Sequence, residues 1–453
     1  MAGTVNQMTE GKPFSTIFFF ALPMLIGNVF QQLYNTVDSV IVGRFVGQEA
    51  LAAVTSAFPV VFLIISVALG ITMGCATVIS QLYGAQRIDE MKKALSTALI
   101  ALNVVGIVLS ILGIFFAGDI LRSMNTRADI LEEATWYLII MFAGMPGVFL
   151  YNGLSAAFRA IGDSKTPLIF LIIASVLNIG LDLLFVLIFQ MGVPGVAIAT
   201  VIAQFVSAFL CILYIIRYVP LLHFTKKELV FEKSMFATML RMAVPSTAQQ
   251  LIVSFGIIAM QSLINTFSVA FIAGFGAATK IETFVIMPIL NISMAFSTFV
   301  AQNIGAQKIE RIKEGYKACM IMAVGFGIVM TGMAFLFGEQ MMGLFLDVNK
   351  SQEAVSVGIS YIAVVSMFYF LFGAMLTANG VLRGAGDMSV FMLGTILNLV
   401  TRVGAAYMLA GQIGQDAIWW SVPIGWAMSA FVANARYFTG GWKNKQVIQA
   451  VME

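Results

Sequence analysis

The chain has 453 residues, of which 60% are hydrophobic and 10% are charged, and its formal net charge is +3. Soluble domains carry roughly 25% charged residues, and a water-soluble fold of this length could not hide so much apolar surface. The composition therefore excludes an ordinary soluble enzyme and a nucleic-acid-binding surface, and it predicts an all-α polytopic protein embedded in a lipid bilayer.

Apolar runs between charged or Gly/Pro breaks predict twelve membrane-spanning helices. Their approximate limits are 14–42, 52–82, 94–117, 129–151, 167–190, 193–217, 234–266, 271–302, 316–338, 351–376, 388–411 and 416–438. Several runs exceed the about 20 residues that one span needs, so tilted or kinked helices are expected. Pro23 and Pro245 lie inside the first and seventh runs and are candidate kink sites.

Lysine and arginine are distributed unequally between the two sides of the predicted membrane, with 19 on the side of both termini and 4 on the other. The 19 are Lys12, Arg87, Lys92, Lys93, Arg159, Lys165, Arg217, Lys226, Lys227, Lys233, Arg241, Lys308, Arg311, Lys313, Lys317, Arg383, Arg436, Lys443 and Lys445, and the four are Arg44, Arg122, Arg127 and Lys350. The positive-inside rule then predicts that both termini lie in the cytoplasm, and the expected location is the plasma membrane, as a multi-pass protein. A wrong number of spans would have mixed the two groups, so the split also supports twelve.

The two halves of the sequence repeat in register, with an offset of 220 to 224 residues. The matches are Ala21-Leu22-Pro23 with Ala243-Val244-Pro245, Gly84-Ala85-Gln86 with Gly305-Ala306-Gln307, Arg159…Asp163 with Arg383…Asp387, and Leu177-Asn178 with Leu397-Asn398. Each half has six spans, an even number, so the repeat is parallel and predicts two six-helix bundles related by a pseudo-two-fold axis along the membrane normal. The predicted parts are an N-terminal lobe over 1–217, a cytoplasmic linker over 218–233 and a C-terminal lobe over 234–453. Two such lobes around a central cavity are typical of transport by alternating access.

Polar side chains line one face of the first span. At about 100° per residue, Asn28, Gln31, Gln32, Asn35 and Asp38 fall within about 120° of one helical face. A carboxylate in the hydrocarbon layer costs several kcal/mol, so Asp38 is expected to face a cavity or a partner. A structural hydrogen-bond seam between helices is the alternative for the amides, and the acid at the end of the row favours function.

A second acid, Asp182, lies in the fifth span, and Ser175 and Asn178 share its face within about 60°. The repeat positions of the two acids are Met260 and Arg402, so an ion is expected to be coupled in the N-terminal lobe. Two neighbouring acids in a low dielectric resist double ionisation, so the pair could hold a proton or a small cation such as Na⁺. Arg402 could be a structural partner or a cavity charge.

Other side chains carry weaker signals. The seventh span repeats the polar row without charge, as Gln250, Ser254, Gln261 and Asn265. In the eighth span, Lys280 and Glu282 are expected to pair with each other or to reach other partners. The three cysteines (Cys75, Cys211 and Cys319) lie far apart in apolar runs, and the single histidine, His223, lies in a polar loop, so neither a metal nor a cofactor is predicted.

Together these features resemble the multidrug and toxic compound extrusion (MATE) family of antiporters, over Phe14 to about Phe438. The resemblance is carried by the run from Gln31 to Asp38, the repeated Gly-Ala-Gln and Arg-x-x-Gly-Asp loops, and Asn178 with Asp182. It implies twelve helices in two lobes and export of cationic or amphipathic compounds against H⁺ or Na⁺. Acids in the first and fifth spans, without acids at equivalent depth in the seventh or tenth, look like the DinF-like rather than the NorM-like branch.

The resemblance also implies the residues of the site. Its coupling site would comprise Tyr34, Asp38, Tyr137, Asn152, Asn178, Asp182 and Thr200, and Asp38, Asn178 and Asp182 would be the ligands of Na⁺ if sodium were coupled. Proton coupling is favoured, with the first span bending at Pro23 on protonation. We expect the substrate cavity to be lined by Asn28, Gln31, Asn35, Met141, Gln250 and Gln261.

The expected partners are small amphipathic or cationic substrates and the lipid bilayer, and the chain is expected to act as a monomer. The alternative function is a lipid or lipid-linked precursor flippase of related architecture. An intramembrane enzyme is disfavoured because the sequence has no HExxH and no GxSxG motif near a base. A channel is disfavoured by the two-lobe repeat and the paired acids.

Overall fold

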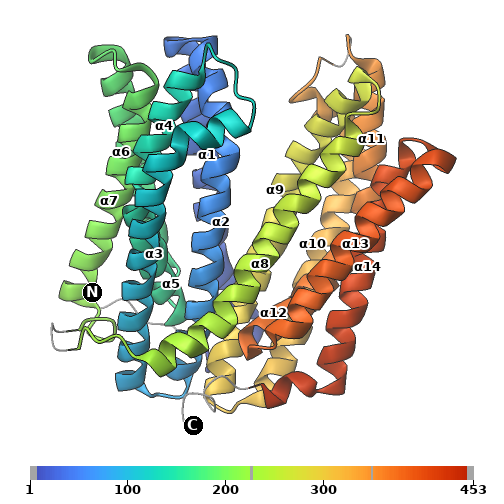
Figure 1. The fold of residues 1–453 in the computed structure, drawn as a ribbon. Helices are drawn as coiled ribbons and strands as arrows, with labels where there is room; N and C mark the ends of the chain where they lie inside the picture. Colours follow the sequence, from blue (N-terminus) through green and yellow to red (C-terminus); the bar gives the residue numbers. More distant parts are fainter. Residues whose placement is uncertain (1–7, 225–227, 348–349, 446–453) are drawn as a thin grey trace. The chain divides into compact units, whose positions relative to one another are not determined.

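The computed structural model describes residues 8–224, 228–347 and 350–445, and within them the chain is α-helical without a strand (Figure 1). Lys226 and Lys227 of the predicted linker lie outside the described residues. The α-helices are α1 (Pro13–Ile41), α2 (Gln48–Gly84), α3 (Ile88–Ser123), α4 (Leu131–Ala143), α5 (Met145–Ala160), α6 (Lys165–Leu183), α7 (Gly192–Tyr218), α8 (Lys233–Ile264), α9 (Val269–Gly305), α10 (Ile309–Gly343), α11 (Gln352–Ser366), α12 (Tyr369–Ala385), α13 (Met388–Ile413) and α14 (Asp416–Thr439). Three short helical turns complete the list: the π-helices η1 (Val42–Val46) and η2 (Leu184–Ile188) and the 3₁₀ turn η3 (Gly441–Asn444).

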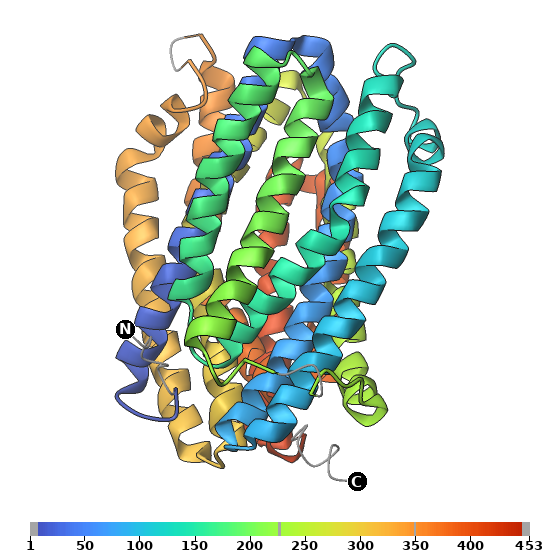
Figure 2. The same cartoon turned by 90° about the vertical axis from the view of Figure 1, so that its left-hand side faces the viewer.

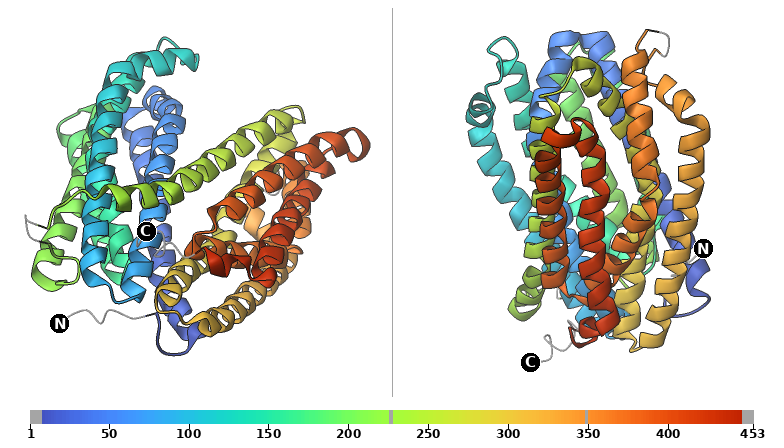
Figure 3. Two further views of the ribbon diagram at one scale, coloured as in Figure 1. Left: turned by 60° about the horizontal axis from the view of Figure 1, so that its bottom comes forward. Right: turned by 90° about the vertical axis from the view of Figure 1, so that its right-hand side faces the viewer.

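Nine of the described helices are long and apolar enough to cross a membrane, and two bent helix pairs raise that number to eleven. The pairs are α4 with α5, bent by 45°, and α11 with α12, bent by 52°. The twelfth predicted span corresponds to α14, which has 24 residues but is not among these candidates. Tryptophan, serine and proline lower the mean hydropathy of α14. It packs along α13 and α12, and Figure 3 shows α13 and α14 side by side in red.

The predicted span over 129–151 is a bent pair of helices rather than one straight helix. The span breaks after Ala143, and Pro146 lies in the first turn of α5. Backbone N–H groups in the first turn have no intrahelical acceptor, so the missing N–H of proline costs no helical hydrogen bond there. The predicted span over 351–376 is also a bent pair, because α11 ends at Ser366 and α12 begins at Tyr369. The two breaks lie at equivalent places in the sequence repeat, although the second contains no proline.

By backbone contacts the described residues form two compact units. The first unit contains residues 22–247, and the second contains residues 8–21 and 248–445. Two helices, α1 and α8, therefore begin in one unit and end in the other. The change falls between Ala21 and Leu22 in α1 and between Thr247 and Ala248 in α8, beside the prolines of the repeated Ala-x-Pro motif. The lobe limits inferred from the repeat stay a prediction.

The segment before α1 is held by the second unit. The Met8 N–H donates to Gln302 Oε1 over 3.0 Å, and Asn303 Nδ2 donates to the Met8 carbonyl over 3.1 Å. The Arg311 guanidinium donates to the carbonyl oxygens of Met8 (3.2 Å) and Gly11 (2.6 Å). These hydrogen bonds fix the beginning of α1 to the junction of α9 and α10.

The segment before α8 is held in the same manner by the first unit. Ser96 Oγ donates to the Val230 carbonyl over 3.0 Å, and the Glu232 N–H donates to Thr97 Oγ1 over 3.1 Å. Ser96 and Thr97 lie on α3, and Arg311 lies on α10, the helices that follow the repeated Gly-Ala-Gln loops. The duplication has therefore kept the anchoring of each entry segment as well as the helices themselves.

Within the first unit, α6 and α7 lie side by side, as Figure 2 shows in green, and α8 crosses α2 at two glycines. A Cβ added at Gly74 would lie 2.5 Å from the Ala243 backbone nitrogen, and one at Gly70 would lie 2.5 Å from the Thr247 Cα. Gly70 and Gly74 form a GxxxG spacing, which lets two membrane helices approach backbone to backbone.

Because the Ala243 backbone cannot move without moving α8, Gly74→Ala is expected to lower the stability of the protein by about 1–3 kcal/mol, the usual effect of overpacking. The measurement is the unfolding temperature of the purified protein in detergent. Gly325→Ala is the matched control, since a Cβ there meets nothing within 4 Å. An unchanged unfolding temperature for Gly74→Ala would show that the two helices do not depend on this close approach.

Candidate functional site

The two intramembrane acids stand where regular helix gives way to a π-helical turn. Asp38 lies near the end of α1, four residues before η1, and Asp182 lies in the last turn of α6, directly before η2. The two π turns contact each other. Single π turns inside membrane helices occur frequently at functional sites, because the extra residue re-aims the side chains around it.

The carboxyl groups of Asp38 and Asp182 lie within hydrogen-bonding reach of each other. Asp182 is 0% exposed and Asp38 is half-buried. Both carboxyl oxygens of Asp182 and Oδ1 of Asp38 are buried without a protein donor. Two carboxyl groups can hydrogen-bond only when one of them is protonated, because an ionised carboxylate has no donor. This geometry suits a pair that shares a proton or holds a small cation between its oxygens.

Asn178 lies one helical turn before Asp182 and is almost fully buried. Its Nδ2 lies 3.4 Å from Thr200 Oγ1 on α7, and the Thr200 hydroxyl donates to the Val196 carbonyl over 3.1 Å. The Asn178 Oδ1 is buried without a donor. The amide is thus oriented by Thr200 with its carbonyl oxygen available beside the acid pair.

Two tyrosines complete the cluster. Tyr34 lies within electrostatic range of both acids, and so does Tyr137, which also lies within range of Tyr34. The Tyr137 ring packs against an apolar cluster that contains Ile41, Val42, Ala50, Val186, Val193 and Val196. This apolar cluster includes one residue of each π turn, Val42 of η1 and Val186 of η2, so apolar side chains pack directly beyond the acid pair along both helices.

Asn152, another residue of the predicted site, makes a hydrogen bond to its own helix. Asn152 donates within its own helix, to the Val148 carbonyl over 2.8 Å. Its neighbour Tyr151 lies within range of Tyr34 instead, and its hydroxyl donates to the Pro167 carbonyl over 3.3 Å. Tyr151 was not predictable from the sequence, because no pattern around a tyrosine next to Asn152 shows which of the two lies nearer Tyr34.

The predicted lining of the substrate cavity is divided between the two units. Gln31 and Asn35 are exposed on α1 and Asn28 is half-buried there. Gln250 and Gln261 lie on the part of α8 that belongs to the second unit, and Gln261 Nε2 donates to Asn265 Oδ1 over 2.8 Å. Met141 is 7% exposed and packs inside an apolar cluster of the first unit.

In the second unit, Glu282 and Lys280 reach other partners rather than each other. The Tyr361 hydroxyl donates to Glu282 Oε2 over 2.7 Å. The Lys280 ammonium lies 5.8 Å from the centre of the Phe345 ring, a cation–π distance. Of the two expectations for this pair, the second is therefore the one that the structure shows.

No group of three or more His, Cys, Asp and Glu side chains is placed to hold a metal ion within residues 8–224, 228–347 and 350–445. Asp38, Asn178 and Asp182 offer two carboxylates and one amide oxygen. Hard oxygen ligands of this number suit a proton or a monovalent cation better than a transition metal. The three cysteines are free and buried, as expected.

Comparison with known proteins identifies relatives over nearly the whole chain. The MatE family model matches twice, at residues 23–184 and 245–408, and the two matches begin at Pro23 and Pro245. The probable multidrug resistance protein YoeA of Bacillus subtilis (strain 168) is 31% identical over 459 residues, 98% of this chain and 97% of that protein. The multidrug export protein MepA of Staphylococcus aureus (strain NCTC 8325 / PS 47) is 25% identical over 428 residues, 93% of this chain and 92% of that protein.

A crystal structure described as MATE in the bent conformation superposes with a TM-score of 0.90 at 25% identity, covering 98% of this chain and 99% of that chain. The double match of one family model confirms the internal duplication. The structural likeness confirms the predicted fold class, an all-α polytopic membrane protein with twelve spans in two six-helix lobes.

Proposed function

The chain belongs to the MatE family of multidrug efflux transporters, and we propose that it is a proton-coupled antiporter that exports cationic or amphipathic compounds. The proposal rests on one observation: Asp38 and Asp182 approach each other at membrane depth while three of their oxygens lack a protein donor. We further propose that the chain acts as a monomer in the plasma membrane with both termini in the cytoplasm.

The mechanism that we propose is competition between a proton and the substrate's positive charge. When the Asp38–Asp182 pair is ionised, its negative charge attracts a cationic compound. A proton that arrives from outside removes this attraction, so the protonated state favours release. Only such a difference in affinity between states can shift the conformational equilibrium. The alternative coupling ion, Na⁺, would bind between the same carboxylates and the Asn178 carbonyl oxygen.

We assign supporting roles to the residues around the pair. Thr200 orients the Asn178 amide, and Tyr34 and Tyr137 surround the carboxyl groups with polarisable rings and hydroxyl groups. This N-terminal arrangement is the basis for placing the chain in the DinF-like branch. Asn152 has only its local hydrogen bond in the structure, so its role is carried by the resemblance alone.

The coupling ion is tested with purified protein in liposomes that contain a fluorescent cationic dye. We expect an inward proton gradient alone to drive dye movement and an inward Na⁺ gradient at equal pH to leave it at the background rate. Movement driven by Na⁺ alone would assign the same residues to sodium coupling. Lipid translocation without any dye movement would favour the flippase alternative.

Bending of α1 at Pro23 is proposed as the step that links the pair to the rest of the protein. Arg311 forms hydrogen bonds to the segment just before α1, and the boundary between the two units crosses α1 beside Pro23. The MATE structure described as bent is a similar protein in which a bent conformation has been observed. A bend at this point would move Asp38 while the anchored turns of α1 stay in place.

Pro23→Ala is therefore expected to reduce efflux at least about tenfold, because alanine favours the straight helix by up to roughly 3 kcal/mol and about 1.4 kcal/mol already shifts an equilibrium tenfold. The measurement is dye efflux from cells that express equal amounts of each variant. Pro59→Ala is the matched control, since Pro59 also lies inside a helix, α2, that stays within one unit. Equal loss in both variants would indicate a general effect of removing a proline rather than a hinge at Pro23.

A further inference from the structure

The second unit holds a charged cluster that the coupling mechanism does not use. It consists of Glu282 on α9, Tyr361 on α11 and Arg402 on α13. Tyr361 donates to Glu282 Oε2 over 2.7 Å, and Arg402 lies within electrostatic range of both residues. Among the described residues, no carboxylate oxygen lies within the 4 Å ion-pair distance of the Arg402 guanidinium.

Arg402 lies deep in the membrane-spanning part of α13. It is 14 residues from the helix start at Met388, which is roughly 21 Å at 1.5 Å per residue. An arginine near the centre of a bilayer costs at least about 2.5–3.5 kcal/mol. The Arg402 Nε is buried and has no hydrogen-bond acceptor in the described structure, which adds to that cost. A guanidinium kept at this depth with an unused donor is a binding group by default.

The hydrogen bond from Tyr361 explains why Glu282 does not form an ion pair with Arg402. Its hydroxyl holds one Glu282 oxygen, and its ring is fixed between Phe275, 5.1 Å away centre to centre, and Trp419, 6.0 Å away. Glu282 therefore compensates the charge of Arg402 from a distance without occupying its donors. The aromatic rings beside the cluster offer flat surfaces on which a planar compound can stack.

The close approach of α14 keeps Arg402 in place. Gly425 on α14 lies against it, and a Cβ added there would lie 2.9 Å from Arg402 Cβ and 2.7 Å from Asn398 Oδ1. Arg402 itself is only partly buried, so part of its side chain is reachable although Nε is enclosed. The Arg402 guanidinium is thus held in position and partly accessible, and it is not engaged in an ion pair with any described residue.

We propose that Arg402 is a carboxylate-recognition residue that binds the acidic group of zwitterionic amphipathic substrates, with Tyr361 as the positioning residue that keeps Glu282 away from it. The inference deepens the proposed export function and rests on it. A guanidinium matches a carboxylate with two parallel N–H···O bonds, which a single-point cation cannot make. The acid pair of the first unit would serve cationic groups, and Arg402 would serve carboxylate groups.

The test uses two dyes that differ only in the group under study, a rhodamine with a free carboxylate and its ethyl ester. Binding is measured on the full chain in detergent by fluorescence anisotropy, so it does not depend on transport. Arg402→Gln is expected to weaken binding of the carboxylate dye about tenfold or more, since losing even one of the two charged hydrogen bonds has that effect, and to change ester binding less than about twofold. Equal weakening for both dyes, or no carboxylate binding by the unmodified protein, would overturn the inference.

Two further variants separate positioning from general structure. Tyr361→Phe frees Glu282 to pair with Arg402, so it should weaken binding of the carboxylate dye in the same selective manner. Tyr361→Phe combined with Glu282→Gln should restore that binding, because the competing carboxylate is gone. A double variant as weak as Tyr361→Phe would contradict the positioning role. Failure of the unmodified protein to export the ester from liposomes would instead count against the proposed function, whatever the binding results.

Discussion

Asp38→Asn is expected to lower efflux of a cationic dye on the order of 100-fold or more, since a unit charge 4 Å from another is worth about 4 kcal/mol at an effective dielectric of 20. Asparagine has nearly the same shape as aspartate, so helix α1 and its packing should be unaffected. The substitution removes the charge that attracts the substrate and the group that takes the proton. Binding of the cationic substrate and uptake of the proton are therefore both expected to be lost.

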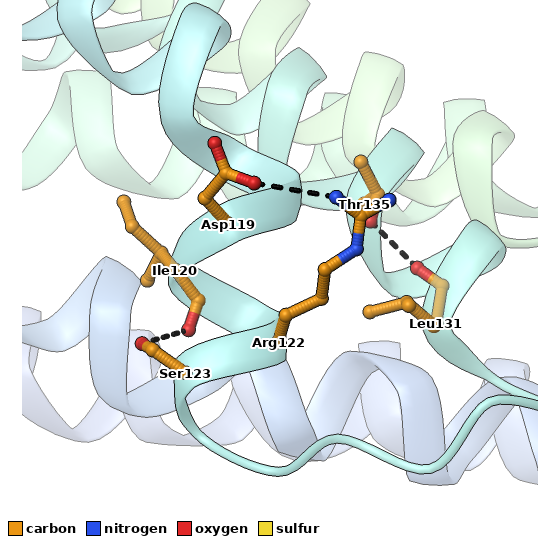
Figure 4. Close-up of polar contacts among 6 residues, drawn as sticks. All are labelled: Asp119, Ile120, Arg122, Ser123, Leu131 and Thr135. Atoms are coloured by element: carbon orange, nitrogen blue, oxygen red, sulfur yellow. Dashed lines mark hydrogen bonds and ion pairs between the residues drawn. The ribbon is translucent and has the colours of Figure 1, made fainter.

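The measurement is dye efflux from cells, with expression checked by immunoblot. Asp119→Asn is the matched control: Asp119 accepts from Arg122 over 3.2 Å at the end of α3, and both side chains are about two-thirds exposed (Figure 4). Exposed ion pairs of this kind contribute roughly 0–1 kcal/mol, so the control should export normally. Full export by Asp38→Asn would refute the assignment of the coupling site.

The periodicity of the sequence was sufficient to predict the position of the acids on their helices. Asp38 ends a polar row on α1, and Asp182 follows Asn178 by one turn, as the structure shows. Their approach to each other could be inferred only from the family resemblance, because hydrophobic periodicity orients each helix but does not say which helices meet. The internal repeat was equally visible, since Pro23 and Pro245 begin matching segments.

Features that depend on tertiary packing could not be read from the sequence. The π turn after Asp182 contains no Gly or Pro, and the single Gly43 in the turn after Asp38 does not by itself indicate a π turn. The break between Ser366 and Tyr369 has no proline. The partner of Glu282 is Tyr361, 79 residues further along the chain, rather than the nearby Lys280. Such a choice is made by how α9 and α11 pack, which no local pattern encodes.

The second acid should behave differently from an ordinary buried carboxylate. Asp182 is fully buried and neither of its oxygens has a protein donor, so an ionised carboxylate at this position lowers the stability of the folded state. Asp182→Asn removes this charge and adds an N–H that can donate to Asp38. We therefore expect it to abolish efflux and, at the same time, to raise the unfolding temperature by a few degrees, at roughly 2–4 °C per kcal/mol. A functional site that is stabilised when it is inactivated is a common result of selection for activity.

Asp387→Asn gives the opposite case and serves as the control. The Asp387 side chain is 1% exposed, but it accepts from Arg436 Nε over 2.6 Å. Its replacement leaves the Arg436 guanidinium without its partner, so the unfolding temperature should fall. The loss in free energy of unfolding should stay below the about 3–5 kcal/mol of a fully buried pair, because Arg436 is 29% exposed. If Asp182→Asn lowered the unfolding temperature as Asp387→Asn does, Asp182 would be a structural hydrogen-bonding residue. The proposed role of Asp182 as an uncompensated charge of the coupling pair would then be wrong, because a carboxylate without donors should not stabilise the folded state.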